Sequence, residues 1–454
     1  MKRCLLVFSI LGVFGYHPDI LSTIASLSPI AQTTDLKQPT VLIIVYMAAR
    51  NDLSIYAEKH VKQLLGLGSS DRVKIFVHLD LIKPNEPLFT RNFFVEKDKL
   101  IPLGDDQPMD SGSKDTLIDA ASLAYNYFPA EEVVLVLWNH GTGPIEPKVA
   151  SSINQWELWH VDKSTGKINL DQSIGYLDRF APGDSNFEKP KGICFDDSTG
   201  SYMTIGELTQ AIGSISENII KKKFKIVACD ACLMAGIDVF SPLQPYVEYF
   251  VASQEVELGL GYKYDLILEP LVHNKVCCGV ELAIHFVNAF KEYYSPKIDF
   301  FTHCAIDLSY SEKLEINISN LAQCLCYGME HQDTKSVKEA IRLSRHKKFC
   351  IRFNEPTYID LGNFYTNLLS HCPSCELLSG DTKTFQANLA AILKEGLILI
   401  KNAVKANEVG SKHEQANGIS IYFPEYMIHK SYRSNAFAQK TNWLYFLDKY
   451  IISN

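Results

Sequence analysis

Residues 133–143 read VVLVLWNHGTG, an apolar run that ends in a histidine and two glycines. A continuous apolar run rich in β-branched residues is typical of a strand that helices cover on both faces. His140 therefore follows directly after a buried strand. In a parallel sheet this position is the carboxyl end of the strand, where α/β proteins build their sites. Gly141 and Gly143 allow a sharp turn and a close approach of the backbone to a ligand.

Similar apolar runs alternate with amphipathic stretches on both sides of this segment. Further strands are expected at 40–47, 73–79, 224–229 and 249–253, and helices at 51–65, 116–127, 204–220 and 233–240. Asn51 or Asp52 can cap the first of these helices, and Thr204 with Glu207 forms a capping box for the third. Strands and helices that alternate at this spacing predict right-handed βαβ units. The expected fold is a three-layer α/β/α sandwich with a mostly parallel central sheet.

The chain divides into three expected parts. Residues 1–31 combine Lys2 and Arg3 with an apolar run of signal-peptide length, which predicts export to the periplasm, the cell surface or the outside of the cell. Residues 38–270 form the α/β domain, with an irregular insertion at 144–191. Residues 271–454 are mainly helical and are expected to pack on that domain, with helices at 280–293, 311–327, 358–369, 384–405 and 442–452 and a strand at 418–423.

Composition excludes several classes of protein. The 454 residues carry a formal net charge of −8 and no long basic stretch, which argues against nucleic acid as a partner. No later window offers about 20 uncharged apolar residues, so no membrane insertion is expected after signal removal. Twelve cysteines are too few for a disulfide scaffold, and most are expected to be buried thiols. Cys372 and Cys375 lack the second half of a zinc site, so a disulfide or two free thiols are expected there.

A second segment, FKIVACDACLM at 224–234, repeats the pattern of a buried strand that ends in chemically active side chains. Here the strand ends at Asp230, and Cys232 precedes a stretch that is helical in character. A thiol at a helix N-terminus is favoured as thiolate by the helix dipole. Because two parallel strands deliver Cys232 and His140 to one sheet edge, the sequence predicts nucleophilic acyl transfer.

With these residues the chain resembles a clostripain-type cysteine peptidase (family C11, clan CD), which has the caspase-like fold. The blocks that carry the resemblance follow the order of the family: VYMAARNDL at 45–53, LWNHG at 137–141, GICFDD at 192–197, DACLM at 230–234, VASQE at 251–255, AIDL at 305–308, YIDL at 358–361 and GISIYFP at 418–424. The resemblance implies a cysteine endopeptidase that acts on protein or peptide substrates through a thioester. Cys232 would be the nucleophile, His140 the general acid/base, and the backbone N–H groups of Gly141 and Cys232 the oxyanion hole.

The resemblance also implies cleavage after Arg or Lys, which needs buried carboxylate in the first substrate pocket. Asp230 matches such an acid, and Ser253 and Glu255 are expected to line the same pocket. Leu260 stands where the family pattern often has an acidic residue. Either Glu255 and Glu257 compensate for this loss, or the preference has moved away from strictly basic residues.

Members of this family mature by cutting themselves after the histidine block. The matching stretch is the insertion at 144–191, whose basic candidates are Lys148, Lys163, Lys167, Arg179, Lys189 and Lys191. The active form would be a monomer or a self-cleaved two-chain form. Neither a metal nor another cofactor is predicted. Some relatives use Ca²⁺, and Asp196 and Asp197 can bind a hard cation, but adjacent acids alone do not specify a site.

Two alternatives come from different classes of function. One is an exported binding or scaffold protein on a silent peptidase fold, against which the presence of both His140 and Cys232 argues. The other is a thiol oxidoreductase that uses Cys229 and Cys232 as a C-x-x-C pair. The position of Cys229 inside an apolar strand argues against it.

Overall fold

The computed structural model describes residues 40–81, 89–145, 159–162, 167–170, 192–371 and 380–452. The expected export segment, Cys372, Cys375 and most of the 144–191 insertion lie outside these residues. The same holds for all basic cleavage candidates except Lys167, the first residue of β7 (Lys167–Leu170), which pairs with β6 (Trp159–Asp162).

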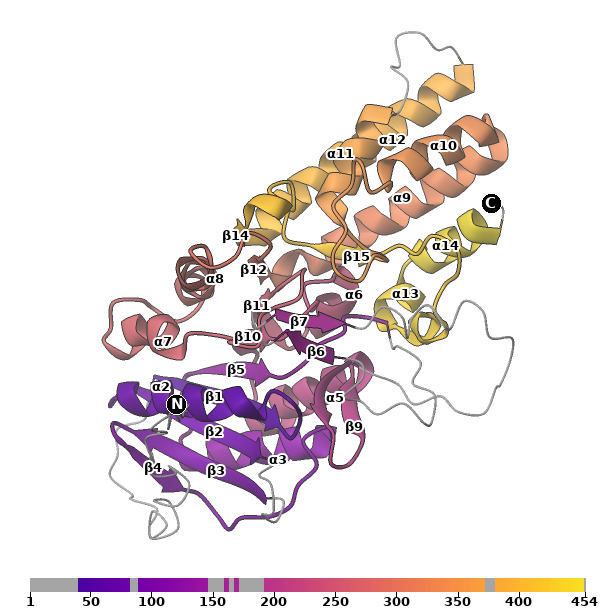
Figure 1. Cartoon of the computed structure of the whole chain (residues 1–454). Coiled ribbons are helices and arrows are strands. Elements are labelled where there is room, and N and C mark those ends of the chain that lie inside the picture. Colours follow the sequence, from indigo (N-terminus) through magenta and orange to yellow (C-terminus); the bar gives the residue numbers. More distant parts are fainter. Residues whose placement is uncertain are drawn as a thin grey trace, which may run out of the picture.

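A nine-stranded sheet runs through the molecule in the order β14-β12-β11-β10-β5-β1-β2-β3-β4 (Figure 1). Its five central strands are parallel: β11 (Val247–Ala252), β10 (Phe224–Asp230), β5 (Glu132–Trp138), β1 (Val41–Ala49) and β2 (Val73–Leu81). Antiparallel strands extend both edges: β12 (Thr302–Asp307), β14 (Val404–Val409), β3 (Phe89–Glu96) and β4 (Lys99–Pro102). The prediction of a mostly parallel sheet is confirmed.

Helices cover both faces of the sheet, which explains why its central strands are apolar throughout. One face carries α2 (Ser54–Leu67), α7 (Tyr264–Val272) and α8 (Val280–Tyr294), and the other carries α3 (Lys114–Tyr127) and α5 (Ile205–Ser214) (Figure 1). Every residue of β1 is buried. The three-layer arrangement therefore follows from strands that have no polar face to show to water.

The C-terminal region is mainly helical, as predicted, but it also contributes to the central sheet. The long helices α9 (Ser311–His331), α10 (Thr334–Ser344), α11 (Leu361–His371), α12 (Gly380–Ala403) and α14 (Trp443–Ile452) lie beyond the β14 edge (Figure 1). Strands β12 and β14 come from this region and pair in succession onto β11. A small two-stranded sheet of β13 (Tyr358–Asp360) and β15 (Ser420–Tyr422) lies between the helices and the site. No helix in the described residues is long and apolar enough to cross a membrane.

Several boundaries differ from the sequence expectation because tertiary pairing overrides local periodicity. The helix expected at 384–405 ends at Ala403, and the chain continues as β14 along β12. The helix expected at 358–369 begins with three residues of β13. The sequence pattern also missed the hairpin of β3 and β4 and the strand β12, whose apolar runs are short. The capping box at Thr204 is present, and α5 then continues into a π-helical turn at Ile215–Ile219.

Candidate active site

The two segments singled out by the sequence lie side by side at one sheet edge. β5 and β10 are adjacent and parallel, with Trp138 paired to Asp230 at their carboxyl ends. The N–H of Asn139 donates to the carbonyl of Asp230 at 3.3 Å. A Cβ atom on Gly141 would lie 2.5 Å from the carbonyl oxygen of Cys232, closer than van der Waals contact permits. The backbones after the two strands therefore touch, and only glycine fits at position 141.

Cys232 lies in a tight turn between β10 and α6 (Ile237–Phe240). The next residue, Leu233, has a φ of 64°, a left-handed conformation that is uncommon for a residue with a side chain. The Cys232 side chain is buried, and its sulfur accepts a hydrogen bond from the N–H of Glu257 at 3.2 Å. Burial raises the pKa of the Cys232 thiol well above its ordinary value.

This environment corrects one expectation from the sequence. The helix expected at 233–240 begins only at Ile237, so the Cys232 thiol does not lie at a helix N-terminus. Because the influence of a helix dipole falls off within one turn, it does not favour the thiolate here. Burial instead favours the neutral form of the Cys232 thiol, which lies under the segment that contains Glu257.

His140 is buried and its Nε2 atom lies 2.6 Å from Oδ1 of Asp52. The expectation that Asn51 or Asp52 caps α2 is wrong, because Leu53 is the N-cap and no side chain caps that helix. The carboxylate of Asp52 points to the imidazole instead. Sequence reasoning missed this role, although a signal was present: Asp52 follows β1, which pairs with β5, so both residues leave the sheet at the same edge.

Two asparagines fix the backbone immediately before Asp52 and His140. The amide group of Asn51 donates to the carbonyl of Phe195 at 2.9 Å. The amide group of Asn139 donates to the same carbonyl at 3.1 Å, and its oxygen accepts from the N–H of Phe195 at 2.7 Å. One residue of β8 (Gly192–Asp196) thereby joins the ends of β1 and β5.

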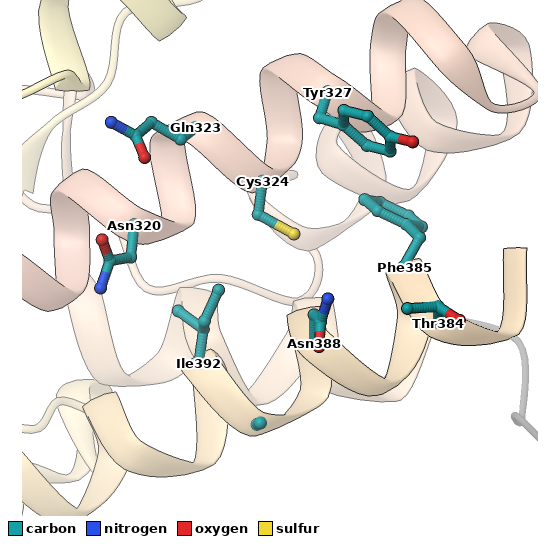
Figure 2. A pocket seen from close by; sticks show the side chains of 9 residues that line it. Asn320, Gln323, Cys324, Tyr327, Thr384, Phe385, Asn388 and Ile392 are labelled. Carbon is teal, nitrogen blue, oxygen red and sulfur yellow. The ribbon is translucent and has the colours of Figure 1, made fainter. Parts of the chain in front are cut away.

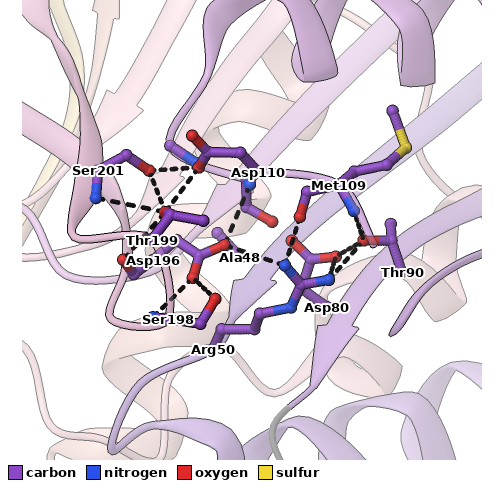
Figure 3. A network of polar contacts seen from close by, with 12 residues as sticks. Ala48, Arg50, Asp80, Thr90, Met109, Asp110, Asp196, Ser198, Thr199 and Ser201 are labelled. Atoms are coloured by element: carbon purple, nitrogen blue, oxygen red, sulfur yellow. Dashed lines mark hydrogen bonds and ion pairs between the residues drawn. The ribbon is translucent and has the colours of Figure 1, made fainter. Parts of the chain in front are cut away.

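A buried ionic network around Arg50 lies next to this backbone (Figure 3). The Arg50 guanidinium lies 3.5 Å from Asp80 and 3.3 Å from Asp196, and it donates to Thr90 at 2.9 Å. Burial raises the pKa of Asp80 to about 7. Asp196, considered above as a cation ligand, is thus an ion-pair partner of Arg50. In the described part of the chain, no cluster of three or more His, Cys, Asp or Glu side chains is arranged to hold a metal ion.

Asp230 lies in a second buried polar cluster next to Cys232. Its carboxylate accepts hydrogen bonds from the N–H of Tyr262 at 2.9 Å and from the hydroxyl of Tyr264 at 3.1 Å. Glu257 lies beside Asp230, and burial raises the pKa of both carboxyls above their ordinary values. Glu257 also lies 3.3 Å from Nδ1 of His303, whose pKa burial lowers to about 3. The carboxyl groups of Asp230 and Glu257 therefore lie together in one buried cluster beside the turn of Cys232.

The other two residues expected in the substrate pocket face the C-terminal region. The hydroxyl of Ser253 donates to the carbonyl of Thr302 at 2.7 Å. The carboxylate of Glu255 accepts from the N–H of Asn354 at 2.9 Å and lies 3.2 Å from Nε2 of His413. Their backbones nevertheless contact the turn of the cysteine, because the carbonyl of Glu255 accepts from the N–H of Leu233 at 3.2 Å and the carbonyl of Ser253 accepts from the N–H of Ala235 at 2.9 Å. The structure thus brings Asp230, Ser253 and Glu255 to the turn of Cys232, while the side chains of Ser253 and Glu255 connect the end of β11 to the later part of the chain.

Two further features do not belong to the predicted site. Cys229 is fully buried within β10, and the described cysteines, Cys229 and Cys232 included, are all free thiols. A cavity of about 650 Å³ lies between α9 and α12 (Figure 2). It is lined by apolar and amide side chains such as Phe385, Ile392 and Asn388, and by none of the predicted site residues.

Comparison with known proteins gives a family and a fold. The model of the clostripain family (peptidase C11) matches residues 45–170 and 179–450. Among solved structures, a secreted C11 cysteine protease from Bacteroides thetaiotaomicron in complex with an irreversible peptide inhibitor has 16% sequence identity and a TM-score of 0.57, covering 90% of this chain and 99% of that chain.

An inactive zymogen C11 protease from Parabacteroides distasonis has 15% identity and a TM-score of 0.57, covering 89% of this chain and 99% of that chain. The secreted C11 cysteine protease iotapain from Bacteroides thetaiotaomicron has 14% identity and a TM-score of 0.55, with coverage of 90% and 99%. No curated protein matches the chain. At these identities the structural likeness concerns the fold.

Proposed function

Because the chain belongs to the clostripain family of cysteine-type endopeptidases, we propose that Cys232 is its nucleophile and His140 its general acid/base. One observation carries this assignment: β5 and β10 are neighbours in a parallel sheet, and the backbone of Gly141 touches the carbonyl of Cys232. A cysteine and a histidine that leave one sheet edge side by side are the groups that acyl transfer needs.

In the proposed reaction His140 takes the proton of the Cys232 thiol, and the sulfur attacks the carbonyl carbon of the scissile peptide bond. The backbone N–H groups of Gly141 and Cys232 stabilise the oxyanion, and each such donor is worth about 10²–10³ in rate. His140 gives a proton to the leaving amine as the C–N bond breaks, which leaves a thioester on Cys232. Water, deprotonated by His140, then attacks the thioester, releases the carboxylate product and restores the thiol.

The buried thiol supports a resting form that must open before it reacts. The N–H of Glu257 holds the sulfur of Cys232, and the side chain is only 1% exposed. Attack on a substrate therefore requires the segment around Glu257 to move away from the turn of the cysteine. We infer that cleavage within 144–191 by the enzyme itself accompanies this change, and that the mature protein acts after export.

The carboxyl groups near the nucleophile support a preference for Arg or Lys before the scissile bond. Asp230 and Glu257 lie side by side and are buried, and a cationic side chain placed beside them would form an ion pair with one ionised carboxyl while the other stays protonated. Glu257 contacts the sulfur of Cys232 through its N–H, whereas the carboxylate of Glu255 is held by Asn354 and His413. Ser253 and Glu255 then contribute to the pocket by holding the end of β11 in place.

The assignment is tested by comparing the wild type with Cys232→Ala and His140→Ala. A lysyl or arginyl peptide chloromethyl ketone should alkylate the wild type at residue 232, and both variants should lose peptide hydrolysis. Cys229→Ser serves as the control, because it changes a neighbouring thiol that the mechanism does not use. Mass spectrometry of a cleaved peptide library gives the preferred residue and any new N-terminus of the protein itself. Equal cleavage by Cys232→Ala would show that the mechanism is wrong, and loss of activity in Cys229→Ser would favour dithiol chemistry.

A further inference from the structure

We propose that Asp52 is a positioning residue of this peptidase, which orients the His140 imidazole and stabilises its protonated form; the proposal rests on the function assigned above to His140. Oδ1 of Asp52 lies 2.6 Å from Nε2 of His140, within the range of a charge-assisted hydrogen bond. The His140 side chain is 1% exposed and that of Asp52 is 20% exposed. The imidazole of His140 is therefore shielded from water, and the charge of the Asp52 carboxylate acts on it more strongly than it would in water.

The contact also selects which ring nitrogen does the chemistry. An ionised carboxylate only accepts hydrogen bonds, so Nε2 of His140 must carry a hydrogen. Nδ1 is then the nitrogen that takes up and gives away the proton during the reaction. Without Asp52 the ring could also carry its hydrogen on Nδ1, and in that tautomer Nδ1 could not accept a proton.

The backbone on both sides of the contact is held rigidly, as a positioning role requires. The carbonyl of Phe195 accepts from the amides of Asn51 and Asn139, the residues directly before Asp52 and His140. The oxygen of the Asn51 side chain in turn accepts from the N–H of Leu53 at 3.0 Å. Asp52 thus follows two anchored residues, Arg50 and Asn51. The carbonyl of Arg50 accepts from the N–H of Asp197 at 2.8 Å, and its side chain is buried in the ionic network of Figure 3.

The arrangement has a specific chemical consequence. A carboxylate beside an imidazole favours the charged imidazolium, which is the form that donates a proton to the leaving amine. Asp52 should therefore extend the active range of the enzyme toward higher pH. A residue that only supported the fold would change the amount of active enzyme equally at every pH.

The experiment compares full-length wild type with Asp52→Ala and Asp52→Asn, using a fluorogenic peptide that the wild type cleaves. Asp52→Asn retains an oxygen that can accept from Nε2 but removes the charge. Asp448→Ala is the matched control, since Asp448, on the distant helix α14, forms an ion pair of the same 2.6 Å length with Arg433. The readouts are kcat and KM from about pH 5 to pH 10, and the thermal midpoint of each protein.

We expect Asp52→Ala to lower kcat by about 10- to 100-fold, part of the 10²–10⁴ that a positioned acid or base supplies. KM and the thermal midpoint should stay near the wild-type values, and the alkaline limb of the kcat profile should move to lower pH. Asp52→Asn should show the same shift of the limb with a smaller loss of kcat. Asp448→Ala should leave kcat and its pH profile unchanged.

Two results would overturn the proposal: unchanged kcat in Asp52→Ala, or a loss of kcat that is uniform across the pH range. Either result leaves the assignment of Cys232 and His140 intact, because that assignment is tested separately by Cys232→Ala and His140→Ala. If those two variants keep activity, the function assigned to His140 fails first and the role of Asp52 fails with it.

Discussion

Gly141 is a residue at which the backbone after β5 meets the turn that carries Cys232. Its missing side chain lets the backbone after β5 lie against the turn that carries Cys232. Asp52, His140 and Cys232 follow the ends of three different strands. These strands, β1, β5 and β10, are consecutive neighbours in the sheet. Small displacements at any of the three strand ends therefore change the geometry of the whole site.

Gly141→Ala should strongly reduce activity. The new Cβ would lie 2.5 Å from the carbonyl oxygen of Cys232 and 3.0 Å from the sulfur of Met234, so the backbones must separate. Overpacking of this kind costs about 1–3 kcal/mol in stability, and we expect kcat/KM to fall by about 100-fold, because a misplacement of about 1 Å is sufficient for such a loss. Peptide hydrolysis and thermal unfolding measure the two effects.

Gly66→Ala provides the matched control. Gly66 is exposed on α2 and a Cβ there meets nothing within 4 Å. The substitution should leave activity unchanged and stabilise the protein by about 0.5–1 kcal/mol, since alanine favours a helix. If Gly141→Ala retained wild-type kcat/KM, the contact between the two segments would not matter for the reaction.

The buried carboxyl of Asp238 should make the free energy of unfolding depend on pH. Its carboxylate is fully buried and accepts from the N–H of Tyr422 at 3.1 Å, and burial raises its pKa from 3.8 to about 7. Between these two values the unfolded chain has lost the proton and the folded chain keeps it. The folded state then binds more protons, so the free energy of unfolding falls as the pH rises, and above about 7 the loss is complete.

Asp238→Asn removes this ionisation and keeps an oxygen that can accept from Tyr422. The variant should lose less stability than the wild type between about pH 5 and about pH 8. Urea unfolding at the two pH values measures the difference. Equal losses in both proteins would mean that Asp238 is already ionised at about pH 5 in the folded state.

At the scale of single elements, capping determines where helices begin, and the two clearest examples differ. α5 starts at a capping box in which Thr204 and Glu207 exchange two hydrogen bonds of 3.0 Å. α2 has no side-chain cap, although Asn51 and Asp52 directly precede its first turn. Those side chains contact Phe195 and His140 instead, so they are not available to cap the helix.

Thr204→Ala should destabilise the protein by about 1 kcal/mol, the usual cost of losing an N-cap. Thr209→Ala, five residues later in the same helix, is the control. Its hydroxyl donates only to the carbonyl of Ile205 one turn earlier, so alanine should be neutral or slightly stabilising there. Chemical denaturation of the two variants compares the effects, and equal destabilisation would contradict the capping role.

At the scale of the whole molecule, the C-terminal region and the α/β part are joined through shared structure. β12 and β14 complete the sheet, and Glu255 at the end of β11 contacts Asn354 and His413. β15 also forms a parallel bridge to Gly236, four residues after Cys232. The turn that carries Cys232 is thus held in place by residues more than 100 positions away in the chain.

The described parts should therefore unfold as one cooperative unit. Calorimetry should give a single transition, and Glu255→Ala should lower its midpoint without splitting it, because unsatisfied buried groups cost about 1–3 kcal/mol. Glu255→Gln keeps an acceptor oxygen and should have a smaller effect. Two separate transitions in the wild type would show that the C-terminal region folds independently.

Local runs of residues were enough to predict the buried parallel strands, many of the helices and the family blocks around His140 and Cys232. The helices α7 and α10 were not predicted. The sequence could also place His140 and Cys232 at one edge, since parallel strands all end on the same side. Only the tertiary structure decided that β12 and β14 complete the sheet and that Glu257 covers the sulfur of Cys232. It also decided that Asp52 faces His140. Those contacts join residues far apart in the chain, and hydrophobic periodicity does not indicate which residues form them.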